Sequence, residues 1–438
     1  MAGEWMKRKI GSLGRVVTGK TPSTADPANF GGHYPFITIP DLDGRVFISR
    51  TERTLSEKGA ETIRASLLPA GSVMMSCIAT VGRCGITTRP SFTNQQINSV
   101  VPHDGVDSRL LYYVFTQLGH ELESAGGGGS VYTNVSKSRF ADIDVVIPKD
   151  IAEQRAIAHI LGTLDDKIEL NRRMSETLEA MARALFKSWF VDFDPVRAKA
   201  EGRDPGLAQP LADLFPDSFE DSELGEIPKG WAVGCVGDEF DLTMGQSPPG
   251  HTYNEVGDGL PFYQGRTDFG FRFPTRRVYC TAPTRLAKKG DTLISVRAPV
   301  GDINMATEDC AIGRGVAAAR HKTGSRSYSY QFMRAQADAF DRFEAEGTVF
   351  GSIGKKDFHA IACVVPPRGL VAEFERRVAP LDSRIEVTDH ESRTLAALRD
   401  ALLPKLISGE LRLPAALRNR AAQAGIKDAE RFLKERGL

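Results

Sequence analysis

The chain of 438 residues lacks the features that mark several large classes of protein. It has no run of about 20 apolar residues and its first 17 residues lack the apolar core of a signal peptide, so we expect a cytoplasmic protein. The six cysteines form no C-x-x-C pair, which argues against a zinc site or a disulfide framework. Basic and acidic residues each number 56, so the basic surplus common in nucleic-acid-binding proteins is missing. Segregated charges would still permit DNA binding.

Catalytic signatures are also missing from the sequence. It contains no H-E-x-x-H, no nucleophile elbow and no G-x-G-x-x-G pattern after a strand. The eight histidines are scattered along the chain and suggest no shared site. We therefore expect no catalytic residue, no metal site and no cofactor.

What the chain does contain is an internal repeat. Residues 18–22 (TGKTP) match residues 244–248 (MGQSP) at an offset of 226, and residues 71–76 match 290–295 at an offset of 219. Further along, GSVY at 129–132 matches GTVF beginning at Gly347, at an offset of 218. An offset that changes by only a few residues predicts two homologous domains with small loop deletions.

One motif within the repeat suggests a nucleotide site. Residues 14–21 satisfy the phosphate-loop pattern G-x-x-x-x-G-K-[ST], which requires a helix directly after the loop. Here Pro22 follows at once, and the matching segment 240–247 lacks both the first glycine and the lysine. We interpret the motif as a structural turn, with an NTP-dependent enzyme as the alternative.

Each repeat reads as a strand-rich part followed by a long helix. β-Branched runs at 34–39, 72–78 and 144–147 predict strands, and residues 110–123 predict a helix. From 151 to 190 the only glycine or proline is Gly162, and apolar residues recur at helical spacing. The pattern as a whole predicts an α+β fold.

The two long helices carry matching seams, each apolar at its ends and polar at its centre. The polar positions are Asn171 and Ser175 in the first helix, and Thr388 and Ser392 in the second. This match predicts a coiled coil whose register the polar residues fix. The alternative is two separate amphipathic helices, each lying on its own domain. The predicted seam residues are Ile157, Leu161, Leu164, Ile168, Asn171, Leu178 and Leu185 in the first helix, and Phe374, Val378, Leu381, Ile385, Leu395 and Leu402 in the second.

Several blocks resemble the specificity subunits of type I restriction-modification systems. The blocks are DVVIP at 144–148, AEQRAI at 152–157, LDDKIELN at 164–171, WFVDFDP at 189–195, GEIPKGW at 225–231 and LPKLISGEL at 403–411. The resemblance covers Trp5 to Leu413. It implies two target-recognition domains separated by two antiparallel helices, without a catalytic site. Its implied ligand is double-stranded DNA and its implied partners are modification (methyltransferase) subunits, with restriction (nuclease and translocase) subunits where the system has them.

This resemblance and the composition together predict the domain boundaries. The expected parts are a first target-recognition domain at 1–150, a spacer helix at 151–194, a connector at 195–230, a second target-recognition domain at 231–368, a second spacer helix at 369–413 and a basic tail at 414–438. Two recognition domains on a rigid spacer would read two half-sites at a fixed separation. Since the domains differ in sequence, an asymmetric bipartite target is expected. The pseudo-symmetric outer faces of the helices would dock two modification subunits, with Arg172, Arg173, Glu176 and Glu179 as candidate contacts.

Comparing the two repeats selects candidate DNA contacts. Positions alike in both are expected to be framework or phosphate contacts, and polar positions that differ are expected to read bases, with Arg suited to guanine and Asn or Gln to adenine. The candidates in the first repeat are Lys20, Thr21, Thr38, Asn94, Gln95, Gln96, Asn98, Tyr132, Asn134 and Lys137. Those in the second are Gln246, Ser247, Gln264, Arg266, Arg297, Arg314, Phe350, Ser352 and Lys355.

Some of these assignments have alternatives. Lys137 and Lys355 contact phosphates or are solvated lysines, and the amide cluster at 93–98 either reads a base or caps its own loop. Tyr132 and Phe350 contact a base or sugar, or pack internally. A third function, a structural scaffold that joins protein partners, would show no salt-dependent affinity for DNA.

Overall fold

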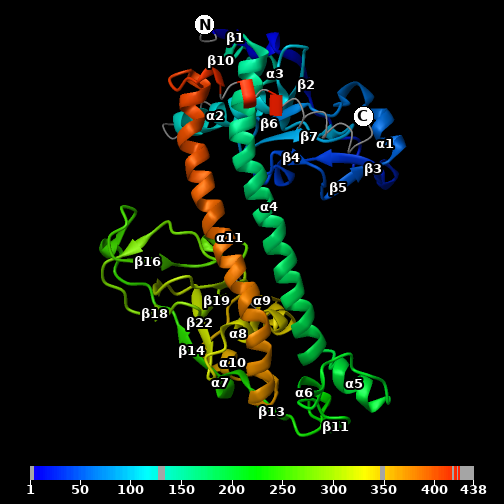
Figure 1. The fold of residues 1–438 in the computed structure, drawn as a ribbon, viewed down its shortest axis with the longest axis vertical. Helices are drawn as coiled ribbons and strands as arrows, with labels where there is room; N and C mark the ends of the chain where they lie inside the picture. The colour runs from blue at the N-terminus through cyan, green and yellow to red at the C-terminus, as the bar shows by residue number, and fades with distance from the viewer. Residues whose placement is uncertain (1–3, 127–133, 346–350, 417–418, 422, 425–438) are drawn as a thin grey trace. The chain divides into compact units, whose positions relative to one another are not determined.

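A computed structural model describes residues 4–126, 134–345, 351–416, 419–421 and 423–424. The chain divides into two compact units, Met1–Arg172 with His390–Leu438 (unit 1) and Arg173–Asp389 (unit 2). Each unit combines one strand-rich domain with parts of two long helices, α4 (Ile151–Phe190) and α11 (Arg368–Ser408) (Figure 1). The compact units therefore cut across the helices instead of following the predicted domain boundaries. Among the described helices, none combines the length and apolar character needed to cross a bilayer.

Unit 1 is built on a five-stranded sheet with the order β2-β9-β6-β7-β4, a three-stranded sheet β5-β3-β8 and an antiparallel pair of β1 with β10. Helix α2 packs on β6 and β7 (Figure 1). The predicted strands and helix correspond to β3, β6, β10 and α2. The elements are β1 (Trp5–Lys9), β2 (Gly14–Thr18), β3 (Phe30–Ile37), β4 (Phe47–Ile48), β5 (Arg53–Leu55), α1 (Glu57–Thr62), β6 (Val73–Ser76), β7 (Cys84–Thr87), β8 (Phe92–Thr93), β9 (Ile97–Pro102), α2 (Ser108–Gly126), α3 (Lys137–Asp142) and β10 (Asp144–Pro148).

Unit 2 repeats this arrangement. Its sheet β14-β22-β19-β20 corresponds to β2-β9-β6-β7, and its pair of β13 with β23 corresponds to β1 with β10. The register is the same in both copies, since Thr18 pairs with Asn98 and Met244 pairs with Ala317 at the repeat offsets. The elements are β13 (Ala232–Cys235), α7 (Val236–Glu239), β14 (Phe240–Met244), β15 (Tyr253–Asn254), β16 (Leu260–Tyr263), β17 (Tyr279–Cys280), β18 (Leu286–Ala287), β19 (Thr292–Ser295), β20 (Ile303–Met305), β21 (Cys310–Ile312), β22 (Val316–His321), α8 (Arg326–Ala335), α9 (Ala337–Ala345), α10 (Lys355–His359) and β23 (Ala362–Val365).

The segment expected to be a connector is folded onto unit 2. It forms α5 (Asp194–Ala200), α6 (Gln209–Ala212) and a hairpin of β11 (Phe219–Ser222) with β12 (Gly225–Pro228). Val196, Leu211 and Phe215 are buried in the core of unit 2 together with Trp189. The segment is therefore part of a packed unit and not a free tether.

Within each unit the two long helices contact one another. In unit 1, Asn171 Nδ2 donates to Ser392 Oγ at 3.3 Å. In unit 2, Ser175 Oγ and Thr388 Oγ1 lie 2.9 Å apart. Residue numbers rise along one helix as they fall along the other, so the helices are antiparallel, as predicted. The polar residues expected at the centre of the seam are therefore partners across it.

The predicted seam residues differ in burial. Ile157 and Leu161 lie in the core of unit 1, while Phe374 and Val378 lie in the core of unit 2, so the helix ends also pack on the domains. The seam residues that are buried are Ile157, Leu161, Asn171, Phe374, Val378 and Ile385. Those that are half-buried are Leu164, Ile168, Leu178, Leu185, Leu381, Leu395 and Leu402.

Candidate nucleic-acid interface

The loops that carry the candidate DNA contacts are held by the same backbone hydrogen bonds in both units. In unit 1 the N–H groups of Gly19, Asn94, Cys77 and Val135 donate to the carbonyls of Ile97, Ile37, Gln96 and Cys77 respectively. In unit 2 the equivalent donors are Gly245, Gly313, Val296 and Ile353, and their acceptors are Val316, Tyr263, Gly315 and Val296. The repeated framework places equivalent residues of the two domains in equivalent positions.

Gly19 and Gly245 show why the turn retains glycine in both copies. A Cβ atom on Gly19 would lie 2.1 Å from the carbonyl oxygen of Asn94, and one on Gly245 would lie 2.1 Å from that of Gly313. Residues 14–18 form strand β2, and residues 19–26, all described, form no helix. The motif therefore lacks the helix N-terminus that a phosphate loop needs, which agrees with a structural turn.

In unit 1 one amide of the predicted cluster is exposed at the rim of these loops. Thr21 Oγ1 donates to Gln95 Oε1 at 2.6 Å, and the NH2 group of this exposed side chain takes no part in that bond. Lys20 is exposed beside it. Thr38 is half-buried, and its N–H and hydroxyl both donate to Asp41 at 2.7 and 2.8 Å. Thr38 therefore caps its own turn.

The other amides of the cluster serve the domain itself. Asn94 Nδ2 donates to Gln96 Oε1 at 2.9 Å and Asn94 Oδ1 accepts from Gln96 N at 3.1 Å, so this pair caps the loop. Asn98 is 3% exposed, donates to the carbonyl of Val135 and accepts from Thr18 Oγ1. The predicted DNA contact of Asn98 is corrected here, because a buried amide with both polar groups in use has no surface to offer a base.

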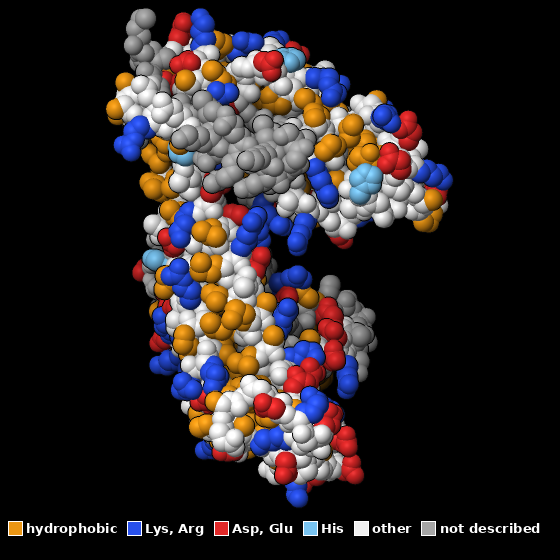
Figure 2. Space-filling model, turned by 45° about the vertical axis from the view of Figure 1, so that its right-hand side comes forward, with side chains coloured by type: hydrophobic (Ala, Val, Ile, Leu, Met, Phe, Trp, Pro, Cys, Tyr) orange, Lys and Arg blue, Asp and Glu red, His pale blue; other side chains and the backbone are white. Residues whose placement is uncertain are grey.

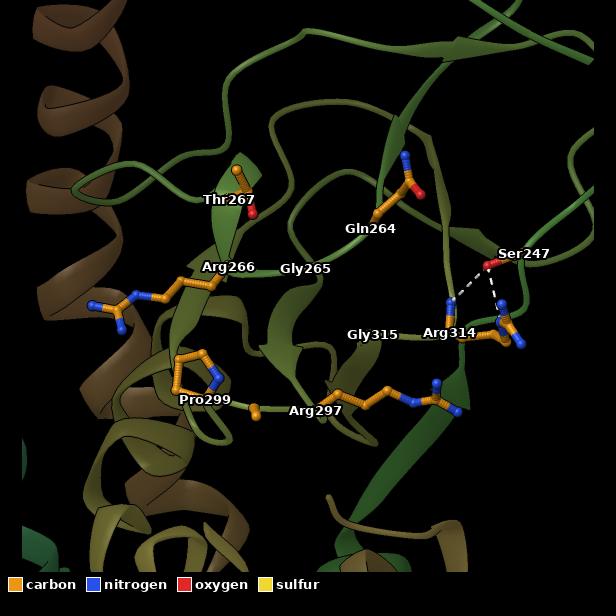
Figure 3. A pocket seen from close by; sticks show the side chains of 10 residues that line it. Ser247, Gln264, Gly265, Arg266, Thr267, Arg297, Pro299, Arg314 and Gly315 are labelled. Carbon is orange, nitrogen blue, oxygen red and sulfur yellow. Dashed lines mark hydrogen bonds between the residues drawn. The ribbon is translucent and has the colours of Figure 1, made fainter. Parts of the chain in front are cut away.

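In unit 2 five candidate residues line one hollow of about 510 Å³. They are Ser247, Gln264, Arg266, Arg297 and Arg314 (Figure 3). Gly265, Thr267, Ala298, Pro299 and Gly315 supply the rest of the lining. Residues far apart in the sequence thus converge at a polar concavity with three arginines.

The three arginines of the hollow differ in their partners. Arg314 N and Nε both donate to Ser247 Oγ at 3.4 Å, and this contact joins the same two repeat positions as the bond that Thr21 Oγ1 donates to Gln95 in unit 1. Figure 3 shows the guanidinium groups of Arg297 and Arg314 on the same side of the hollow. Arg266 points the other way and its Nε lies 3.0 Å from Asp302, which weakens its assignment as a base contact.

The remaining candidates lie at the edges of these two sites. Asn134 forms an isolated bridge with Ile78, and Ser352 forms the equivalent bridge with Arg297. Asn134, Ser352, Gln246 and Gln264 are exposed. Lys137 and Lys355 are exposed as well and begin the equivalent short helices α3 and α10. Tyr132 and Phe350 lie outside the described residues.

Comparison with known proteins relates the chain to one family. A family model described as the type I restriction modification DNA specificity domain matches residues 2–180. The MjaIX specificity subunit of Methanocaldococcus jannaschii is 28% identical over 429 residues, 94% of each chain. The HindI specificity subunit of Haemophilus influenzae is 36% identical over 178 residues, 39% of each chain. Residues 2–180 therefore match the DNA specificity domain of this family, and along most of its length the chain is similar to type I restriction-modification specificity subunits. The resemblance predicted from the sequence is thereby confirmed.

A solved structure shares the fold of this chain. The crystal structure of a type I restriction-modification S subunit from M. genitalium matches with a TM-score of 0.54 at 17% identity. The match covers 92% of this chain and 96% of that chain. Mixed sheet domains and a long helix pair are thus the architecture of both.

Unit 2 also contains a buried ion network that was not predicted from the sequence. Arg272, 2% exposed, pairs with Glu179 of α4 and lies 2.6 Å from Asp382 of α11. Glu179 also accepts from Arg334 at 2.6 Å. Its expected place on a partner-docking face is therefore wrong, because Glu179 is itself buried. Arg172 is half-buried and pairs with Glu169, while Arg173 and Glu176 are exposed.

Burial shifts the pKa of two groups near these sites. It raises the pKa of Asp382, an effect that the positive charge of Arg272 opposes. Burial also raises the pKa of Cys77, which precedes Ile78 at the loop framework of unit 1, to about 11. The Cys77 thiol therefore stays protonated at neutral pH, which disfavours nucleophilic chemistry there.

Proposed function

We propose that this specificity subunit gives a type I complex its DNA sequence preference. Each recognition domain reads one half of an asymmetric bipartite site, and modification subunits supply the methyl transfer. One observation carries the proposal: the two domains share a backbone framework but place different side chains at equivalent positions. Thr21 contacts Gln95 in unit 1, and Ser247 contacts Arg314 in unit 2. A shared framework with different side chains suits two domains that bind similar duplexes but recognise different bases. A role on cellular DNA would place the complex in the cytoplasm.

The helix pair would set the separation of the half-sites. Antiparallel contacts at Asn171 with Ser392 and at Ser175 with Thr388 support a single register, because a shift of either helix would separate these polar partners. A fixed register in turn supports a fixed number of base pairs between the two halves.

Docking of two modification subunits is supported by the surface of the helices. Leu170 and Val387 are 54% and 55% exposed, and they are related by the repeat offset of 217. Met181 and Leu398, 55% and 48% exposed, are related by the same offset. Residues eleven apart in one helix share a face, so each helix carries one equivalent apolar strip. Figure 2 shows hydrophobic side chains among Lys and Arg side chains over the long helices. Two copies of one partner suit two equivalent strips.

Methylome sequencing tests this function. A host carrying the cognate modification subunit would be sequenced with and without this gene. One asymmetric, gapped methylated motif that depends on the gene is the expected result. An active modification subunit that yields no new motif would contradict the proposal, and nucleotide binding or DNA-independent assembly would then favour the NTP-dependent or scaffold alternatives.

A further inference from the structure

The hollow of unit 2 presents a positive charge that the described part of unit 2 does not neutralise. Arg297 and Arg314 are exposed at its rim, and no carboxylate among the described residues pairs with either. Arg266, by contrast, is paired with Asp302. Two guanidinium groups on one side of a concavity favour a partner with paired hydrogen-bond acceptors or negative charge.

Two parts of a duplex have that chemistry, the guanine edge and the backbone phosphate. Guanine presents O6 and N7 in the major groove, where arginine makes bidentate contacts. A phosphate is the same in every duplex, so phosphate contacts would be expected at equivalent positions of both domains. The equivalents of Arg297 and Arg314 in unit 1 are Ile78 and Gln95, which are both uncharged. The absence of arginine at these positions of unit 1 therefore favours a guanine base over a phosphate as the partner of Arg297 and Arg314.

Arg314 also contacts a hydroxyl group at the repeat position that holds Gln95 in unit 1. Its Nε lies 3.4 Å from Ser247 Oγ, while the equivalent Gln95 accepts from Thr21 Oγ1 at 2.6 Å. The same hydroxyl position thus orients a guanidinium in one domain and an amide in the other. These are the side chains suited to guanine and to adenine respectively.

We infer that the second recognition domain reads guanine in the major groove through Arg314 and Arg297, and that the first domain has no guanine-reading arginine at these positions. The inference rests on the proposed function. It adds the base class and the groove, which family membership does not supply.

The test uses the assembled complex and duplexes carrying its methylated motif. Each guanine of the motif is replaced in turn by 7-deazaguanine, which lacks N7, and separately by inosine, which keeps O6 and N7. For the wild-type complex we expect one or two 7-deazaguanine positions, all in one half-site, to weaken binding by about 5- to 150-fold. Inosine at the same positions should have little effect.

The variants then assign the contact to a residue. In Arg314→Ala or Arg297→Ala, the sensitive position should lose its response to 7-deazaguanine, and Arg314→Gln should make adenine acceptable there. Both side chains are exposed, so the fold should be retained. If the variants weaken every duplex alike, lower the salt dependence and keep the 7-deazaguanine response, the arginines bind phosphate and the inference is wrong. A complex with no motif at all would instead remove the proposed function, and the inference with it.

Discussion

Arg272 pairs with Asp382 at 2.6 Å in the interior of unit 2, and both side chains are at most 3% exposed. Asp165 stands at the equivalent position of unit 1, where Arg399 of α11 pairs with it at 2.6 Å. Val46 occupies the position of Arg272 in the first repeat, because its carbonyl accepts from Ile86 N as the carbonyl of Arg272 accepts from the equivalent Met305 N. The two equivalent aspartates are thus paired with an arginine of the strand-rich domain in unit 2 and with an arginine of α11 in unit 1.

The Arg272 network predicts that removing one of its side chains strongly lowers the free energy of unfolding. Arg272→Met would leave Glu179 and Asp382 close together and buried, so the free energy of unfolding of unit 2 should fall by about 3 to 5 kcal/mol. Chemical denaturation would measure the change. The matched control is Arg276→Met, which breaks the exposed pair with Glu308 and should cost at most about 1 kcal/mol. Equal losses in the two variants would contradict a buried role for Arg272.

The hydroxyl pair at the seam predicts a measurable coupling. Ser175→Ala and Thr388→Val each remove one side of the 2.9 Å contact, and a double-mutant cycle should give a coupling energy of about 0.5 to 1.5 kcal/mol. Thr177 is an exposed hydroxyl residue on the same helix. Thr177→Ala combined with Thr388→Val should be additive. A coupling of similar size in this control would mean that the cycle does not report on the seam.

The amide cluster of unit 1 predicts two different phenotypes for neighbouring residues. Gln95→Ala should relax recognition of one half-site by roughly 1 to 3 kcal/mol while the fold is kept, because the side chain is exposed. Asn98→Ala should instead destabilise the domain by about 1 to 3 kcal/mol, because Thr18 and Val135 lose a buried partner. Methylation of single-base motif variants and thermal unfolding separate the two effects. Loss of stability without any change in specificity in Gln95→Ala would exclude a base contact.

The equivalent apolar strips predict a stepwise loss of partners. Leu170→Glu and Val387→Glu should each lower the occupancy of one modification subunit in native mass spectra, and the double variant should lose both. Leu224→Glu is the control, because Leu224 is similarly exposed, at 42%, on the β11–β12 hairpin. Two bound partners in the double variant would place the docking surface elsewhere.

The repeat and the long helices could be predicted because each leaves a local trace in the sequence. Matching segments at offsets from 226 to 218 follow from a shared fold, and the helical spacing of apolar residues follows from burial of one face. The same traces anticipated that Ser175 and Thr388 would lie at the centre of the seam. The comparison of the repeats also selected Arg297 and Arg314 as candidate base contacts, because these positions differ between the copies while the surrounding positions are alike.

What escaped prediction depends on contacts between distant segments. Asn98 appeared to be a surface amide until the pairing of β2 with β9 and the position of Val135 buried it. Glu179 resembled any charged residue on the outside of a helix, because its partner Arg272 has no counterpart in the first repeat. Comparing repeats finds shared features and substitutions at shared positions, but it does not find a tertiary contact made by one copy alone.

Each recognition domain begins and ends in one antiparallel strand pair, β1 with β10 and β13 with β23. The chain therefore enters and leaves each domain at neighbouring points, in the same register in both copies. A gene segment exchanged between these points would carry one complete strand-rich domain and leave the helix pair unchanged. Under the proposed function, such a recombination would change one half of the target in a single event, while the other half and the spacing are inherited unaltered.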